Sequence, residues 1–179
     1  MRMGSAAHKA MEDNITDEAK LSAMGLGDLQ AVFASSEWKG IADRVQRELP
    51  FIMYVRAGGK DCFVRGRMDA VVLEDSPRII DYKFASWKPG AEDTYRMQMA
   101  AYSLAVMKSS GAENAVGELW YLKSPMKIVR AEYSKTGAET LIADLLNQYF
   151  EALQSNVWPK ADRAHCDRVE CGFRAECWG

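Results

Sequence analysis

Three residues that can do metal-assisted chemistry lie on two neighbouring apolar segments near the middle of the chain. Asp69 lies in the segment 68–73, and Asp81 and Lys83 lie in the segment 78–84. Because side chains alternate along a strand, Asp81 and Lys83 are expected to project from the same face. Burying a charge is costly unless it is paired or bound to a metal. These charged side chains therefore indicate a functional site.

The chemistry that this set favours is metal-assisted hydrolysis of a phosphodiester bond. Carboxylate oxygens are hard ligands that suit Mg²⁺ or Mn²⁺ better than zinc, and the backbone carbonyl of Tyr82 offers a further oxygen. A metal lowers the pKa of bound water and polarises the phosphodiester. A lysine beside the metal, here Lys83, can orient or deprotonate the attacking water, or neutralise charge that develops on a phosphate oxygen.

The elements that must position these residues begin with a β-hairpin. The two segments are rich in β-branched residues, and the residues between them, 74–77, are typical of a turn. A strand over 45–55 is expected to precede them, which makes three antiparallel strands. A helix over 95–108 follows the hairpin. Two strands over 115–123 and 127–133 and a helix over 137–153 come next, so the order predicts an α/β fold, a mixed central β-sheet flanked by helices.

Helices are also expected ahead of the strands, over 3–14 and in shorter pieces over 16–46. His8 and Glu12 are four residues apart and so share one helical face, as do Gln98 and Tyr102 on the later helix. By spacing alone, His8 is interpreted as a half-buried histidine beside an acidic neighbour. The last helix is expected to pack one apolar row against the core: Leu141, Leu145, Tyr149, and Leu153 or Ala152.

Length and composition limit the classes of protein that the chain can represent. A chain of 179 residues with 48% hydrophobic and 27% charged residues is typical of one globular domain. It has neither a signal-peptide pattern nor an apolar run of membrane-spanning length, so a cytoplasmic protein is expected. The net charge of −2 gives no support for a nucleic-acid partner, which therefore requires a local site.

Five motifs follow one another along the chain from residue 4 to about 102. They are Gly4-x-x-x-His8-x-x-x-Glu12, Glu48-Leu-Pro-Phe51, Gly66-Arg-Met-Asp69, Ile80-Asp81-Tyr-Lys83 and Gln98-x-x-x-Tyr102. In this order they resemble the PD-(D/E)xK nucleases, and more narrowly the RecB/AddA-type nuclease domain at the C-terminus of helicase-nucleases. The resemblance implies a restriction-endonuclease-like fold.

The resemblance assigns a role to each residue that matches a motif. It implies that Asp69 and Asp81 are metal ligands and that Lys83 is the catalytic lysine. It also implies a metal ligand at His8, and since imidazole is a softer donor than Mg²⁺ prefers, Mn²⁺ is expected to serve as well or better. Glu48 matches the acidic position that binds a second metal or a metal-bound water.

Two further matches lie on the helix after the hairpin. Gln98 and Tyr102 match residues that support the site and contact the DNA strand. Basic residues near the site are expected to follow phosphates: Arg56, Lys60, Arg65, Arg67, Lys88 and Arg96. Trp87 is interpreted either as a stacking platform for a base or as a lid on the core.

The cysteines favour a tail packed by free thiols. Some relatives hold an iron-sulfur cluster with one cysteine before the first motif and three after the last. Here Cys166, Cys171 and Cys177 have a different spacing, and Cys62 is expected in the core. A cluster normally needs four thiolates, so an iron-sulfur cluster is not expected. A zinc site that uses His165 is chemically possible but poorly spaced.

The function that the resemblance implies is a Mg²⁺- or Mn²⁺-dependent deoxyribonuclease of the exonuclease type, active in DNA repair and recombination on single-stranded ends. Residues 1–179 are expected to be one nuclease domain, excised from the C-terminus of a larger protein that supplies a helicase partner. The alternatives are a catalytically silent DNA-binding or scaffolding module of the same fold, and a nuclease that acts on RNA. The intact carboxylates and lysine favour an active enzyme.

Overall fold

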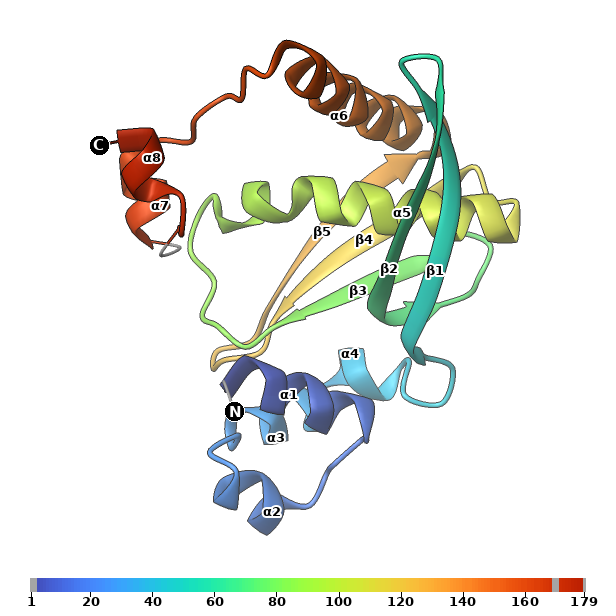
Figure 1. Ribbon diagram of the computed structural model, residues 1–179. Helices are drawn as coiled ribbons and strands as arrows, with labels where there is room; N and C mark the ends of the chain where they lie inside the picture. Colours follow the sequence, from blue (N-terminus) through green and yellow to red (C-terminus); the bar gives the residue numbers. More distant parts are fainter. Residues whose placement is uncertain (1–2, 169–170, 179) are drawn as a thin grey trace.

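The centre of the molecule is a mixed β-sheet. In the part of the chain that the computed structural model describes, residues 3–168 and 171–178, five strands form one sheet in the order β1-β2-β3-β4-β5 (Figure 1). Only β3 and β4 are parallel neighbours, and the other neighbours are antiparallel, so the predicted mixed sheet is confirmed. The strands are β1 (Gln46–Ala57), β2 (Lys60–Val72), β3 (Arg78–Lys83), β4 (Asn114–Tyr121) and β5 (Lys127–Ser134).

β1 and β2 form a long two-stranded ribbon that extends beyond the rest of the sheet. The strands pair from Gln46 opposite Val71 to Ala57 opposite Lys60. β2 pairs with β3 over only a short stretch, with Ala70 opposite Ile80 as the pair farthest from the hairpin turn. The remainder of β2 pairs with β1 alone. The predicted three antiparallel strands are therefore present, but they diverge just before Ala70.

Helices cover both faces of the sheet. Four short helices, α1 (Met3–Glu12), α2 (Glu18–Ala23), α3 (Asp28–Ala34) and α4 (Ser36–Lys39), lie on one face, and α5 (Arg96–Ser110) and α6 (Lys135–Ser155) lie on the other (Figure 1). The core accordingly divides in two. Ile80 and Tyr82 pack with α1–α4, whereas Ile79 packs with α5. The alternation of side chains along β3 thus serves both layers.

α5 makes the connection that parallel strands require. Two parallel neighbours cannot be joined by a tight turn, and here the chain leaves β3, passes through a 3₁₀ turn (Ala91–Tyr95) and α5, and returns as β4. The helix is apolar around most of its circumference because it is buried between the sheet and α6. It ends at Gly111, whose φ of 80° is the left-handed conformation that glycine adopts easily.

The apolar row predicted for the core face of α6 is correct only in part. Leu141 packs against the core and Ala152 is buried, as expected, but Leu145, Tyr149 and Leu153 are 44%, 49% and 54% exposed. Ala138 and Ile142 are buried in their place. Because the alanines are small, α6 can approach its neighbours on that side, and the larger side chains turn outward.

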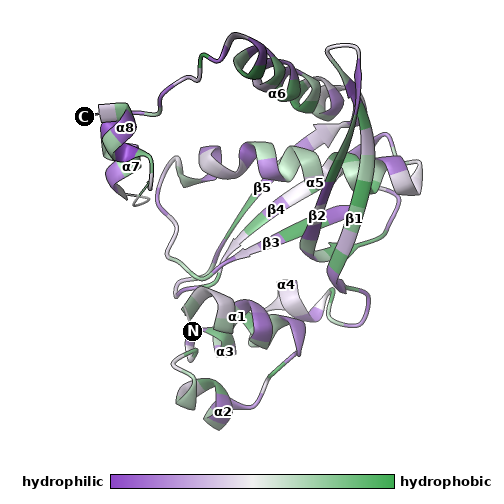
Figure 2. Cartoon of the chain, in the orientation of Figure 1, coloured by the Kyte–Doolittle hydropathy of each residue, from purple (hydrophilic) through white to green (hydrophobic). Residues whose placement is uncertain are grey.

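The chain ends in two short helices, α7 (Arg163–Arg168) and α8 (Arg174–Trp178), reached by a connecting segment after α6 (Figure 1). Cys166 of α7 is buried, and Cys62, Cys171 and Cys177 are partly buried. Figure 2 shows that hydrophobic (green) and hydrophilic (purple) segments alternate along α6 and along the β1–β2 ribbon. No helix among the described residues is both long and apolar enough to cross a membrane.

Candidate metal centre

Asp69 lies at the point where β2 separates from β3. Ala70 is still paired with Ile80, but Asp69 has no ladder partner on β3. The Asp69 side chain makes the contact with β3 in place of the backbone: its Oδ2 accepts a hydrogen bond of 2.7 Å from the backbone N–H of Tyr82. The carboxylate therefore lies between the two strands, where its second oxygen is available to other groups.

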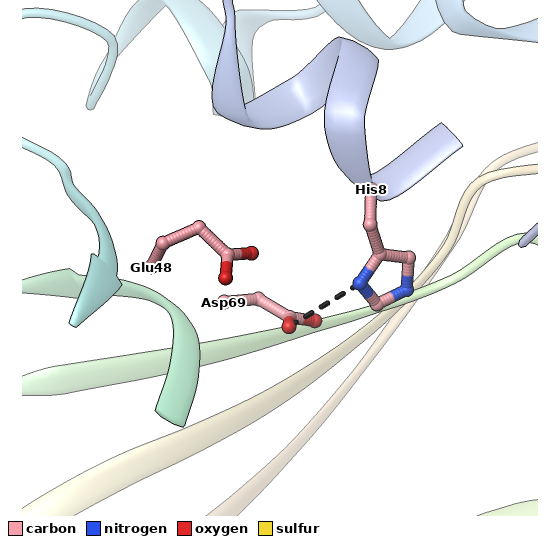
Figure 3. Close-up of side chains that lie close together, drawn as sticks. All are labelled: His8, Glu48 and Asp69. Carbon is pink, nitrogen blue, oxygen red and sulfur yellow. Dashed lines mark ion pairs between the residues drawn. The ribbon is translucent and has the colours of Figure 1, made fainter. Parts of the chain in front are cut away.

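Glu48 of β1 lies opposite Asp69 and has an unusual backbone conformation. The flanking pairs, Arg47 opposite Ala70 and Leu49 opposite Met68, are formed, whereas the pair between Glu48 and Asp69 is missing. The φ of Glu48 is 50°, which is uncommon for any residue other than glycine. This local twist brings the Glu48 carboxylate toward Asp69 (Figure 3).

His8 reaches the same place from α1. That helix is fixed to the sheet by Ala7, Ala10 and Met11, all fully buried. His8 Nδ1 lies 3.3 Å from Asp69 Oδ1 (Figure 3). The hydrogen bond to Asp69 raises the pKa of His8 and outweighs the opposite effect of burial, with smaller contributions from the charge of Asp81 and the backbone of Tyr82.

His8, Glu48 and Asp69 together form a group that can hold a metal ion. Each offers one ligand atom, and the three atoms lie within 4.8 Å of one another. The group lines an open hollow of about 390 Å³, so an ion and its remaining water ligands have room. Two carboxylates and one imidazole suit Mn²⁺ or Mg²⁺. Arg67 flanks the group, with Nη1 3.4 Å from Glu48 Oε2.

Asp81 and Lys83 lie beside this group as a separate ion pair. Lys83 Nζ is 2.6 Å from Asp81 Oδ2. Asp81 is 2% exposed, and burial raises its pKa even though Lys83 opposes the rise. Among the described residues, the group of three that could hold an ion does not include Asp81, whose carboxylate is paired with Lys83. The structure places it next to the predicted ligands but paired.

α5 holds the lysine from the other side. Gln98 Oε1 lies 3.5 Å from Lys83 Nζ, and the Gln98 side-chain amide donates a 2.9 Å hydrogen bond to the hydroxyl of Tyr102. The ring centroid of Tyr95 is 3.9 Å from Lys83 Nζ, a close cation–π contact. None of the five motifs includes Tyr95. Its position three residues before Gln98 was the signal that could have found it.

Trp87 is oriented by contacts within the protein. Its indole donates a 3.2 Å hydrogen bond to Glu92, and Lys127 lies 5.5 Å from the ring centroid. The ring is partly buried and packs with the core cluster under α5. This geometry favours the interpretation of Trp87 as a lid on the core.

Comparisons with known proteins identify the family and the fold of the chain. The family model of the PD-(D/E)XK nuclease superfamily matches residues 2–178. A solved structure described as the crystal structure of SSO0001 has a similar fold, with a TM-score of 0.55 and 21% sequence identity over 98% of this chain and 82% of that one. No curated protein matches the chain. Since the family model spans nearly the whole sequence and the five-stranded mixed sheet has the fold expected of it, the chain belongs to the PD-(D/E)XK nuclease superfamily.

Proposed function

We propose that the chain is a Mg²⁺- or Mn²⁺-dependent deoxyribonuclease that hydrolyses phosphodiester bonds at single-stranded DNA ends. The observation that carries the proposal is the convergence of ligand atoms from His8, Glu48 and Asp69 beside the ion pair of Asp81 and Lys83. These residues come from four different elements. A purely structural ion pair would not require such a convergence.

Some residues of the site would bind the ion, and another would interact with the phosphate. His8, Glu48 and Asp69 would hold the ion, with Asp81 and the carbonyl of Tyr82 as the further predicted ligands. A divalent ion bound there supplies a Lewis acid that polarises the phosphodiester and lowers the pKa of a water. The hydrogen bond from Tyr82 N–H fixes one oxygen of Asp69, and the other oxygen lies 3.3 Å from His8 Nδ1, on the side of the proposed ion.

Lys83 supplies a positive charge at the edge of this group. The contacts with Asp81, Gln98 and the Tyr95 ring restrict its flexible side chain before any substrate binds. A restricted ammonium can orient the attacking water or stabilise the negative charge that grows on a phosphate oxygen. Gln98 acts as a positioning residue, and Tyr102 positions Gln98 in turn.

The finer parts of the proposal rest on the order of the five motifs. That order supports a RecB/AddA-type domain that acts as an exonuclease in DNA repair and recombination, on strands delivered by a helicase. The proposed ions are Mg²⁺ and Mn²⁺, without an iron-sulfur cluster.

The proposal is tested with end-labelled single-stranded DNA, with matched RNA as a second substrate. The protein is incubated with Mg²⁺, with Mn²⁺ or with EDTA, and product lengths are followed over time. We expect metal-dependent shortening of the DNA and a rate about 10²–10⁴-fold lower for Lys83→Ala. Lys108→Ala is the matched control, because Lys108 is also on the α5 side of the sheet but pairs with Glu139, away from the site.

Each alternative has its own outcome. DNA that stays intact with both metals would favour a silent binding module, and faster cleavage of RNA would move the substrate class to RNA. Equal rates for the wild type and Lys83→Ala would refute the role of the lysine.

A further inference from the structure

The ribbon formed by β1 and β2 has an inner and an outer face with different partners. On the inner face, Met53, Val55 and Val64 pack into the core with α5 and α6. On the outer face, Ile52 and Phe63 are each 70% exposed and Tyr54 is 44% exposed. The outer face is thus rich in large apolar side chains that the described parts of the chain leave open to solvent.

The outer face carries apolar and aromatic side chains with arginines at neighbouring positions. Tyr54 lies opposite Phe63, with ring centroids 6.1 Å apart, and Ile52 lies opposite Arg65. At the far end Arg56 lies opposite Asp61, which accepts a 2.7 Å hydrogen bond from the Tyr54 hydroxyl.

Stabilisation of the ribbon alone does not account for these side chains. A cross-strand pair stabilises a sheet through contact between its two side chains. Phe63 and Ile52 instead give most of their surface to solvent. Exposed apolar side chains that gather on one face are typical of an interaction site.

The charge of the outer face points to an anionic partner. The face carries three arginines, Arg56, Arg65 and Arg67, against one acid, Asp61, in a chain whose net charge is −2. Asp61 is engaged by Tyr54 and by Arg56 at 4.0 Å, while Arg65 forms no ion pair with any described residue. Aromatic rings next to arginines suit single-stranded nucleic acid, because unpaired bases stack on the rings and phosphates pair with the guanidinium groups.

The outer face is continuous with the candidate metal centre. Arg67 lines the hollow around His8, Glu48 and Asp69 and also a second hollow of about 690 Å³ on the ribbon, beside Ile52 and Arg65. A strand that leaves the metal centre therefore meets Arg67 first, then Arg65 and then the Tyr54–Phe63 pair. At about 3.3 Å per residue, the path from Arg67 to Asp61 is about 20 Å long.

We propose that the outer face of the ribbon binds the single nucleic-acid strand whose scissile phosphate lies at the metal centre. Bases stack on Tyr54 and Phe63, and phosphates contact Arg65 and Arg67. The inference rests on the proposed nuclease function and adds to it a binding site outside the centre. Because a base must be unstacked to offer its face to a side chain, this surface selects single strands over duplex.

The test measures binding without cleavage. Anisotropy of a labelled 20-nucleotide single strand is recorded in EDTA at several salt concentrations, with a blunt duplex of the same sequence in parallel. We expect Tyr54→Ala and Phe63→Ala each to weaken single-strand binding about tenfold. For Arg65→Gln we expect the negative slope of log K against log salt to become shallower by about 0.7, because one phosphate contact is lost. Duplex binding should change little in the aromatic variants.

Matched variants separate this site from general effects. Tyr149→Ala removes a tyrosine of similar exposure on α6, and Arg174→Gln removes an exposed arginine of the tail. Neither should change binding. Tyr54→Trp and Phe63→Trp keep a stacking surface and should retain wild-type affinity even if an alanine variant unfolds.

The outcomes distinguish this inference from the proposed function. Folded ribbon variants with unchanged strand affinity would overturn the inference while metal-dependent cleavage by the wild type remained. A ribbon that binds strands in a protein that never cleaves them would instead overturn the nuclease function. Ribbon variants that alter only self-association, with strand affinity intact, would assign the face to a protein contact and refute the inference.

Discussion

Two buried carboxylates on neighbouring strands, Asp81 of β3 and Glu118 of β4, have very different surroundings. Glu118 accepts hydrogen bonds from Arg78, Arg130 and the Trp120 indole, at 2.7–3.1 Å. Burial alone would raise its pKa, but these donors outweigh burial and lower it. Asp81 has the Lys83 contact alone among the described residues and a raised pKa.

The difference is the one expected between a structural carboxylate and the functional carboxylate that we propose at Asp81. Glu118 joins three strands, since Arg78 comes from β3 and Arg130 from β5, and its bonding capacity is nearly used. Asp81 keeps bonding capacity that the fold leaves unused, next to three potential ligands of an ion. A buried polar group with few partners is a sign of function, because the surrounding structure must bear its desolvation.

Asp81→Asn should show the largest effect on activity. We expect the rate of DNA cleavage to fall at least about 10²-fold, since a neutral amide can neither hold Lys83 nor bind an ion. The unfolding free energy at neutral pH should stay unchanged or rise, because burial raises the pKa of Asp81 and its ionisation therefore costs stability. Lys83 keeps its contacts with Gln98 and the Tyr95 ring in this variant. The two measurements are a cleavage time course and urea unfolding in EDTA. A large loss of stability would place Asp81 in the same class as Glu118.

Glu118→Gln should show the opposite pattern. We expect a loss of about 3 kcal/mol of unfolding free energy, because removing one partner of a buried ion cluster leaves the other unpaired. The cleavage rate of the folded fraction should equal that of the wild type. Urea unfolding measures the first, and cleavage well below the melting temperature measures the second. A specific loss of activity in a fully folded protein would contradict the structural role.

Mn²⁺ should stabilise the protein through the candidate metal centre. Binding to the folded state alone adds about 2.7 kcal/mol at 100 times the dissociation constant. Thermal unfolding with and without Mn²⁺ should show this gain in the wild type and in Glu118→Gln, and its loss in Asp69→Asn and His8→Gln. An equal gain in all four proteins would place the ion elsewhere.

The two carboxylates should respond to pH with opposite signs in metal-free protein. The folded-state pKa of Glu118 is lowered, so its stabilisation is present above its unfolded pKa of about 4.3 and is lost as pH falls through the folded value. The folded-state pKa of Asp81 is raised, so its ionisation costs stability as pH rises from about 3.9 through the folded value.

Unfolding free energies of the wild type, Glu118→Gln and Asp81→Asn across pH 3–7 measure both effects. At the acidic end, the unfolding free energy of the wild type should fall to that of Glu118→Gln. Toward neutral pH, the unfolding free energy of Asp81→Asn should rise relative to that of the wild type. Parallel curves for the three proteins would remove the distinction between the two sites.

The sequence was informative where the relevant contacts are local. The positions of Asp69, Asp81 and Lys83 follow from the alternation of side chains along a hairpin, and the mixed sheet follows from the order of the elements. His8 needed the motif order, because its spacing to Glu12 alone favoured a half-buried histidine. The metal-binding role of these residues stays a prediction.

Features that depend on several distant segments were missed. The Glu118 cluster combines side chains from three strands, and no single stretch contains its pattern. The exposed row on α6 was assigned to the core because periodicity shows that a helix has an apolar face but not which of two rows packs closer. The left-handed conformation of Glu48 was not foreseen, since no glycine marks it.

The left-handed conformation of Glu48 has a consequence for which amino acids position 48 can accept. An L-residue in the left-handed region costs about 1–2 kcal/mol relative to a right-handed conformation, and glycine largely avoids this cost. A library at position 48 selected for heat resistance alone should therefore enrich glycine or asparagine. The same library selected for DNA cleavage should return glutamate. These two results together would show that stability and activity compete at one backbone torsion.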